Sequence, residues 1–273
     1  MDQSTPSGFA LVGPGRAGAA VAAALVAAGP RCVAVAGRHP DAPSTLDVAA
    51  RLAARPAALA DAAAAAPLVV VATPDRALDA VAAALTPHVR AGALVVHLSG
   101  ARGLDALAPL AARGDVDVGA LHPLQSLTGV DDGAALAGAW AAVAGPPAVT
   151  RLAHRLGLRP FPVDDAQRGD YHAAAVVASN HLVALLGQVE RLAATAGIPF
   201  DAFGPLVRTT VDHAFRAGPA AALTGPVARG DVATVAAHLA SIADDERRAY
   251  TALAALAGRL TGRDDTALRE VLA

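Results

Sequence analysis

Three closely spaced glycines near the start of the chain could bind a phosphate group. Gly13, Gly15 and Gly18 follow an apolar run at residues 9–12 with the spacing GxGxxG, and they open an alanine-rich segment of helical length. In a strand-turn-helix unit the first glycine allows the tight turn, the second lets a pyrophosphate approach the backbone, and the third lets helix and strand pack closely. We therefore predict a dinucleotide-binding turn that includes Arg16. The alternative is a tight turn with a purely structural role.

The residues after the second predicted strand indicate which dinucleotide would bind. A site for NAD usually carries an acidic residue there for the ribose hydroxyls, whereas this chain has Gly37 followed by Arg38. A guanidinium pairs well with a phosphate on the 2′ position. The sequence therefore favours NADP, bound as NADPH, over NAD. The alternative is that Arg38 is an ordinary solvated residue.

Polar residues at the ends of later predicted strands could serve the cofactor and the reaction. Thr73 and Pro74 follow one strand, Ser99 follows the next, and His122 lies at the end of another. The carboxyl ends of parallel strands meet at one edge of a sheet, where nucleotide cofactors bind. Reduction by a nicotinamide needs a proton donor, and histidine titrates in the useful range, so His122 is the first catalytic candidate. The alternative is a histidine that hydrogen-bonds the loop before Pro123.

A second group of polar residues follows helical spacing in the second half of the chain. Successive residues of an α-helix advance by about 100°, so His172, Ser179 and Asn180 fall within an arc of roughly 100°, while His181 points away. Polar side chains on an apolar helix need partners. We predict that this stripe is a wall of the active site, with His172 as a second proton-donor candidate and Asn180 as an orienting donor. The alternative is an internally satisfied contact between helices.

Arg229 lies in a turn at residues 224–231 that contains glycine and proline. A guanidinium could hold a substrate carboxylate by two parallel hydrogen bonds. Arg229 could equally pair with Asp231 or with a helix end, and the sequence leaves both possibilities open. Asp231 itself is well placed to cap the helix that follows.

These residues need a sheet edge and a set of helices to position them. The first half of the chain alternates β-branched runs with alanine-rich helical runs, which is typical of a parallel sheet covered on both faces. After residue 165 only helical patterns remain. We predict an α/β fold: an N-terminal Rossmann parallel-sheet domain at 1–164 and a C-terminal all-α domain at 165–273, with a ligand cleft between them. The predicted strands are 9–12, 32–36, 68–72, 94–97, 116–121, 140–144 and 158–163, and the later helices are 171–196, 203–216 and 232–260.

The uncharged stretch at residues 171–189 is long enough to raise the question of a membrane span. Polar side chains among its residues would be penalised in a bilayer, whereas a helix enclosed by other protein can satisfy them. We therefore interpret it as a buried central helix and expect no membrane partner.

Composition excludes several classes of function. All 22 basic residues are arginine, which excludes a Schiff-base lysine, a pyridoxal-phosphate anchor and the lysine of a Walker loop. Cys32 is the only cysteine, which excludes disulfides within the chain and zinc sites with paired cysteines, and fits a cytoplasmic setting. The net charge of −2 gives no electrostatic footprint for nucleic acid. We expect no metal.

Several segments together resemble one protein family. The motif GPGRAG, the strand ends HLSG and LHPLQSL, the helix YHAAAVVASNHLVAL and the segment ALTGPVARGD are similar to those of Rossmann-like proteins with a DUF2520 C-terminal domain. The resemblance spans residues 8 to 255. It implies a fold of the 6-phosphogluconate dehydrogenase-like superfamily, with a C-terminal domain like that of 6-phosphogluconate dehydrogenase, and an NADP-dependent oxidoreductase activity.

The resemblance also points to one departure from the superfamily. Many members use a lysine followed four residues later by an asparagine on the first long helix of the second domain. If Asn180 matches that asparagine, the lysine position is Val176, so the usual proton donor is missing and His172 becomes its substitute. His122 with Pro123 resembles the His-Pro segment of prephenate dehydrogenases, whose histidine contacts the reacting hydroxyl of the substrate.

The sequence and the resemblance together favour an NADPH-dependent reductase of a small 2-oxo acid such as ketopantoate. Ser99 and Asn180 would orient the substrate, His122 or His172 would donate the proton, and Arg229 would hold the carboxylate. Two alternatives stay open: an enzyme acting on an imine or a cyclohexadienyl acid, and a sensor that binds NADPH without turning it over. We expect a homodimer formed through the helical domain.

Overall fold

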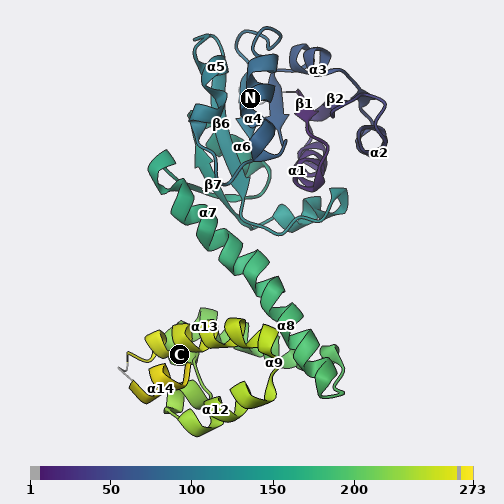
Figure 1. The fold of residues 1–273 in the computed structure, drawn as a ribbon. Helices are drawn as coiled ribbons and strands as arrows, with labels where there is room; N and C mark the ends of the chain where they lie inside the picture. Colours follow the sequence, from purple (N-terminus) through teal and green to yellow (C-terminus); the bar gives the residue numbers. More distant parts are fainter. Residues whose placement is uncertain (1–6, 263–265, 273) are drawn as a thin grey trace. The chain divides into compact units, whose positions relative to one another are not determined.

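The computed structural model describes residues 7–262 and 266–272 (Figure 1). The chain divides into two compact units, one ending at Ser179 and the other beginning at Asn180. The last strand ends at Pro162, close to the domain boundary predicted at residue 164. The first compact unit extends past this strand to Ser179, because residues of the helix that follows the sheet, such as Tyr171, contact it.

One sheet organises the first unit. Its strand order is β3-β2-β1-β4-β5-β6-β7-β8, and all neighbours are parallel except β6 and β7. The first six strands in this order are those of a doubly wound nucleotide-binding sheet, which confirms the predicted fold class. Each predicted strand is present, with ends shifted by at most two residues. The strands are β1 Gly8–Val12, β2 Arg31–Ala36, β3 Arg55–Pro56, β4 Leu68–Val71, β5 Leu94–His97, β6 Asp117–Pro123, β7 Trp140–Ala144 and β8 Arg159–Pro162.

Helices cover both faces of this sheet and create two separate apolar cores. Alternate residues of β1 show the division: Phe9 and Leu11 pack on one face, Ala10 and Val12 on the other. The first face is covered by α1 Arg16–Ala27, α2 Pro43–Arg51 and α6 Pro147–Arg155, and the second by α3 Leu59–Ala65, α4 Asp75–Leu85, η1 Leu104–Leu107 and α5 Ala108–Ala111. Strands buried on both faces must be apolar throughout, which explains runs such as LVVV in β4.

A long helical run leaves the sheet unit after η3 Asp165–Gln167. It consists of α7 Arg168–Val176, a π-helical turn η4 Val177–His181 and α8 Leu182–Thr195. The expectation of a buried central helix is wrong: from Arg168 to Thr195 only Arg168, Gln188 and Ala193 are buried. The apolar side chains of this run are mostly not buried, because the run joins two compact units and its buried residues lie near its ends.

The π turn also corrects the predicted polar stripe. A π turn holds more residues than an α turn, so the regular 100° advance stops after Val176, before Ser179 and Asn180 are reached. The Ser179 hydroxyl donates to the carbonyl oxygen of Ala175 at 2.9 Å, which satisfies it within the helix. His172 lies in regular α-helix and keeps its predicted face.

By length and composition alone, the 31-residue run from Asp165 to Thr195 could cross a membrane. Ser179, Asn180 and His181 near its middle would then have to enter the hydrocarbon core, where polar groups are costly. These polar residues favour the expectation of no membrane span.

The described part of the second unit is helical throughout. Besides α8 it contains η5 Phe200–Phe203, α9 Gly204–Ala217, α10 Pro219–Ala222, α11 Pro226–Arg229, α12 Val232–Ser241, α13 Asp244–Leu260 and α14 Thr266–Leu272. Asp231 caps α12 by accepting from the backbone N–H of Thr234 at 3.1 Å, as predicted. The single helix predicted at 232–260 is instead two, because Ile242 is extended and three acidic residues favour a new helix N-terminus at Asp244.

Candidate active site at the carboxyl edge of the sheet

The glycine turn between β1 and α1 has the geometry that its spacing predicts. Gly13 has φ +96°, and a Cβ there would lie 2.6 Å from the carbonyl carbon of Ala72. A Cβ on Gly18 would lie 2.3 Å from the carbonyl oxygen of Gly13. In contrast, a Cβ on Gly15 would meet nothing within 4 Å. Gly13 and Gly18 are therefore required by the protein's own packing, whereas Gly15 faces open space.

The N-terminus of α1 begins at this open position. Gly15 is the N-cap residue, no side chain caps the helix, and its first turn contains no acidic residue. The partial positive charge of a twelve-residue helix is thus directed at the space beside Gly15. Arg16 is exposed at the same place. An anion such as a pyrophosphate would be stabilised here.

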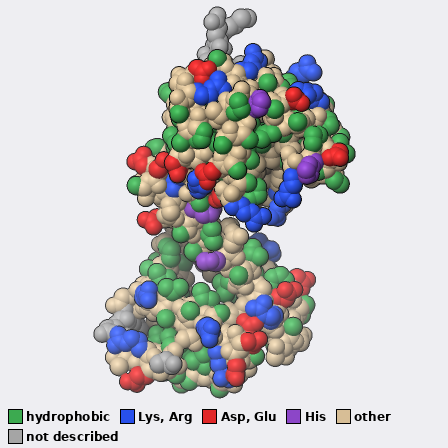
Figure 2. Space-filling model, turned by 45° about the horizontal axis from the view of Figure 1, so that its top comes forward, with side chains coloured by type: hydrophobic (Ala, Val, Ile, Leu, Met, Phe, Trp, Pro, Cys, Tyr) green, Lys and Arg blue, Asp and Glu red, His purple; other side chains and the backbone are tan. Residues whose placement is uncertain are grey.

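The end of β2 is built so that no acidic side chain fits. A Cβ on Gly37 would lie 2.1 Å from the hydroxyl oxygen of Thr45, which is completely buried and donates to the carbonyl oxygen of His39 at 3.0 Å. The next residue, Arg38, is exposed, and no hydrogen bond or ion pair engages its side chain within the described chain. In the view of Figure 2, arginine side chains gather along one rim of the sheet unit.

Thr73 and Pro74 lie beside the glycine turn. The backbone nitrogen of Thr73 would be 2.8 Å from a Cβ on Gly13, and Pro74 is the N-cap residue of α4. The Thr73 hydroxyl is buried, and none of the described residues hydrogen-bonds to it. These positions place a polar group without a partner next to the proposed nucleotide turn.

His97 at the end of β5 is a structural residue that shapes the following loop. Its Nδ1 accepts from the backbone N–H of Ser99 at 3.2 Å, so its proton is on Nε2, which donates to the carbonyl oxygen of Gly103 at 3.1 Å. The side chain is fully buried, and burial lowers its pKa to about 4. The Ser99 hydroxyl accepts from the backbone N–H of Arg102 at 3.0 Å. Ser99 therefore already helps to close this loop.

The pKa of His97 predicts how stability depends on pH. The ordinary pKa is 6.5, so the unfolded chain takes up a proton that the folded protein excludes. The contribution of His97 is fully present above pH 6.5 and is lost as the pH falls toward 4. We expect a loss of about 3 kcal/mol in the free energy of unfolding from this residue, measured by urea unfolding at a series of pH values. His97→Asn should flatten the curve, and an equally steep curve in that variant would contradict the assignment.

His122 on β6 meets two residues of α7. Its Nδ1 lies 2.6 Å from the Tyr171 hydroxyl, and the two rings meet edge to face with centroids 5.6 Å apart. The ring of His172 lies 5.9 Å away, also edge to face. We call His122, Tyr171 and His172 the histidine cluster. The sequence predicted both histidines but gave no reason to place the Tyr171 hydroxyl against His122.

Gly100 brings the loop after β5 against this cluster. A Cβ on Gly100 would lie 2.7 Å from Nδ1 of His172 and 2.9 Å from Nε2 of His122. Its φ is not in the left-handed region, so glycine is needed here for close approach and not for a turn. The motif HLSG was noticed in the sequence, but its glycine was not recognised as the position on which both imidazoles pack.

The environment of the cluster keeps His122 and Tyr171 uncharged at neutral pH. Burial lowers the pKa of His122 to about 4, and the charges of His172 and Arg168 act in the same direction. Burial raises the pKa of Tyr171 to about 12. A neutral imidazole hydrogen-bonded to a neutral phenol can both accept and donate a proton, which is the property needed for acid-base catalysis.

Arg168, one turn before His172 on α7, was missed by the sequence analysis. It is 1% exposed, and its Nε donates to Asp165 at 3.3 Å. Asp165 also accepts from the backbone N–H of Leu104 at 3.2 Å. The only available signal was the four-residue spacing between Arg168 and His172, which places both on one helix face.

Two further predicted site residues, Asn180 and Arg229, lie in the second unit. Asn180 is in the π turn, and Arg229 is an exposed residue at the end of α11. The two units are described separately, so the roles of these residues beside the histidine cluster stay predictions.

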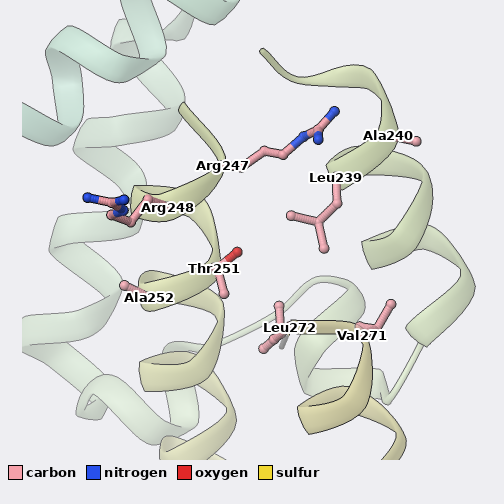
Figure 3. A pocket seen from close by; sticks show the side chains of 8 residues that line it. All are labelled: Leu239, Ala240, Arg247, Arg248, Thr251, Ala252, Val271 and Leu272. Carbon is pink, nitrogen blue, oxygen red and sulfur yellow. The ribbon is translucent and has the colours of Figure 1, made fainter. Parts of the chain in front are cut away.

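An open cavity of about 750 Å³ lies in the second unit among α12, α13 and α14 (Figure 3). Leu239, Thr251 and Leu272 line it, together with Arg247, which pairs with Asp244 at 2.9 Å. It offers no histidine or carboxylate among its lining residues, so we place the candidate chemistry at the sheet edge instead.

Comparisons with known proteins agree with this two-part organisation. A Rossmann-like domain family matches residues 5–123, and a domain of unknown function, DUF2520, matches residues 139–257. No curated protein matches the sequence.

Solved structures show the same fold over nearly the whole chain. One is a protein from Bacteroides fragilis provisionally named an NADP oxidoreductase, with 26% identity and a TM-score of 0.78, covering 93% of this chain and 98% of that one. A Thermotoga maritima protein has 24% identity and a TM-score of 0.62, covering 97% and 98%. An imine reductase from Myxococcus stipitatus in complex with NADP+ has 19% identity and a TM-score of 0.67, covering 97% and 100%.

Proposed function

The chain belongs to the Rossmann-like proteins with a DUF2520 domain, and on that premise we propose that it is an NADPH-dependent oxidoreductase of small carbonyl compounds. The main support is one arrangement: the histidine cluster lies at the carboxyl edge of the sheet whose β1 end presents the open glycine turn. Cofactor and acid-base groups would thus share one edge, as in other nucleotide-binding sheets.

The residues present fit a phosphorylated dinucleotide. The space beside Gly15 and the uncapped N-terminus of α1 suit a pyrophosphate, and Arg16 adds a positive charge. The Thr73 hydroxyl and the N-cap residue Pro74 border the same turn. Thr45 fills the position where an acidic residue would bind an unmodified ribose, and Arg38 is free to pair with a 2′-phosphate.

The histidine cluster can deliver a proton without first becoming charged. When bound, NADPH supplies the hydride that reduces a carbonyl carbon. Tyr171 keeps its proton at neutral pH, and in the tautomer in which its hydroxyl donates to Nδ1 of His122, the proton of His122 is on Nε2. As Nε2 releases its proton to the substrate oxygen, Nδ1 can take up the proton of Tyr171, and the half-buried Tyr171 then regains a proton from water. His172, which follows Tyr171 on α7, is the second candidate for the proton donor.

The substrate we propose is a small 2-oxo acid such as ketopantoate. An imine is the second candidate, because the chain shares its fold with an imine reductase and has a neutral proton donor at this edge. The test is the loss of NADPH absorbance with purified protein against ketopantoate, other 2-oxo acids and cyclic imines. Binding of NADPH without oxidation of it by any member of this panel would favour the sensor alternative.

Arg38 should set the choice between the two dinucleotides. We expect Arg38→Ala to weaken NADPH binding by about tenfold, which corresponds to about 1.4 kcal/mol, and to leave NADH binding unchanged. The loss follows from one charge-assisted pair with the 2′-phosphate. Fluorescence titration with both nucleotides measures it, and Arg31→Ala, at an exposed arginine that begins β2, is the control. An unchanged NADPH to NADH preference would remove this role.

We also propose that a second copy of the chain covers the exposed apolar residues of the long helical run. Val177 and Val183 are 56% and 68% exposed, so a second copy packed on this run would remove apolar surface from water. Light scattering tests the resulting homodimer, and a monomer at micromolar concentration would contradict it.

We place the protein in the cytoplasm, in keeping with its single reduced cysteine.

A further inference from the structure

Arg168 has an unusual environment for a buried cation. Its side chain is 1% exposed, yet both terminal nitrogens, Nη1 and Nη2, are buried and have no hydrogen-bond partner among the described residues. A guanidinium has five N–H donors, and here only the one on Nε is engaged. Burying a charge without partners is costly, so such groups are normally paired.

Asp165 does not provide that pairing. Its carboxylate is half-exposed to water, contacts only Nε of Arg168, and is shared with the backbone N–H of Leu104. This contact fixes the direction of the side chain while leaving the planar pair Nη1 and Nη2 buried and without a partner among the described residues. Arg113 shows the usual arrangement for comparison: it donates to both oxygens of Asp115 and to two backbone carbonyl oxygens.

A second unpaired group lies one helical turn away. Nδ1 of His172 is buried and has no hydrogen-bond partner in the described part of the chain. Residues four apart on a helix lie on the same face, with Cβ atoms roughly 5–6 Å apart. Tyr171 and His172, which contact His122 at the end of β6, lie three and four residues after Arg168 on α7, so Arg168 begins the helix that packs on this strand end.

We propose that Nη1 and Nη2 of Arg168 bind the carboxylate of the substrate, while Nδ1 of His172 faces the polar group on the neighbouring carbon. Two parallel N–H donors match the two oxygens of a carboxylate. His172 lies on the same helix face as Arg168, so its Nδ1 would face an oxygen or nitrogen on the carbon next to that carboxylate. This deepens the proposed function, and rests on it, by naming the substrate class as 2-oxo or 2-imino acids. It assigns to Arg168 the role that the sequence suggested for Arg229.

The decisive experiment measures anion binding by the purified protein, so it does not depend on turnover. Oxamate is the probe, because it has the shape of a 2-oxo acid but no carbonyl that NADPH reduces. Its affinity is measured by calorimetry at constant ionic strength, with and without NADPH, and compared with that of inorganic phosphate. We expect Arg168→Met to lower oxamate affinity at least a hundredfold and Arg168→Lys at least tenfold, since lysine keeps the charge but loses the planar pair.

Two comparisons separate binding from structure. Arg168→Met should melt no lower than wild type, because it removes a buried charge whose two terminal nitrogens have no partner among the described residues, whereas Arg113→Met should lower the melting temperature and leave oxamate affinity unchanged. Oxamate affinity within twofold of wild type in Arg168→Lys, or equally tight binding of phosphate by wild type, would overturn the proposal. If Arg168→Met fails to fold, Arg168→Lys alone decides.

The same titrations distinguish this inference from the proposed function. NADPH should bind Arg168→Met as tightly as wild type. If oxamate binding depends on Arg168 but the protein binds no NADPH, the carboxylate-binding role of Arg168 is supported and the proposed oxidoreductase function is contradicted. If the protein binds NADPH but not oxamate, the carboxylate-binding role of Arg168 is contradicted and the proposed oxidoreductase function is retained.

Discussion

Replacing His122 by alanine is expected to lower the turnover number by about 10²-fold to 10⁴-fold, the range typical of a positioned general acid. NADPH affinity should stay the same, because His122 lies at β6 and the nucleotide turn lies at β1. Steady-state kinetics and nucleotide titration of the same preparation measure both quantities. His154→Ala, an exposed histidine on α6, is the matched control.

Tyr171→Phe tests the relay through which His122 would be reprotonated. Removing the hydroxyl leaves Nδ1 of His122 without its partner at 2.6 Å while keeping the ring and its packing on Phe161. We expect a lower turnover number with an unchanged KM for the carbonyl substrate. If neither His122→Ala nor His172→Ala slows turnover, the proposed acid-base mechanism must be abandoned.

Replacing Gly15 by valine is expected to lower NADPH affinity by about 10²-fold, or about 2.7 kcal/mol, without unfolding the protein. The new side chain would enter the open space beside the N-terminus of α1, where a Cβ meets no protein atom within 4 Å. Its backbone is extended, with φ −80° and ψ 179°, which valine adopts without strain. Nucleotide titration and thermal melting together measure the two effects.

Two other glycines provide the controls for this prediction. Gly18→Ala places a Cβ against the carbonyl oxygen of Gly13 and should destabilise the protein itself. A Cβ on Gly169, in α7, would meet nothing within 4 Å, so Gly169→Ala should lower neither NADPH affinity nor the melting temperature. Equal loss of stability in Gly15→Val and Gly18→Ala would show that Gly15 serves packing, and the assignment of the nucleotide site would fail.

The strands and the glycine turn could be predicted from the sequence because their signals are local. A strand buried on both faces must be an unbroken apolar run, as in β4 and β5, and a GxGxxG turn needs its glycines within six residues. Only some residues of the candidate site could be predicted from the sequence. His122 and His172 are residue types that attract attention, whereas Gly100 and Arg168 matter through contacts between segments far apart in the chain.

Arg168 shows why the remainder could not be predicted. In the sequence it stands in Gln167-Arg168-Gly169-Asp170, between polar residues, which is typical of a solvated turn. Its burial depends on how α7 packs on the ends of β5 and β6, and no periodicity within α7 encodes that. The π turn at Val177–His181 likewise has no glycine or proline to indicate it, so nothing in the sequence indicated a departure from an ideal helical wheel at Ser179 and Asn180.

The contact between Gly37 and Thr45 limits how this protein could change its coenzyme. An aspartate introduced at position 37 would collide with the Thr45 hydroxyl before its carboxylate reached any ribose. Thr45→Ala alone would only open a small gap and leave the His39 carbonyl oxygen without its donor. A lineage moving from the phosphorylated to the plain dinucleotide would have to alter both positions together, since each single step is a loss.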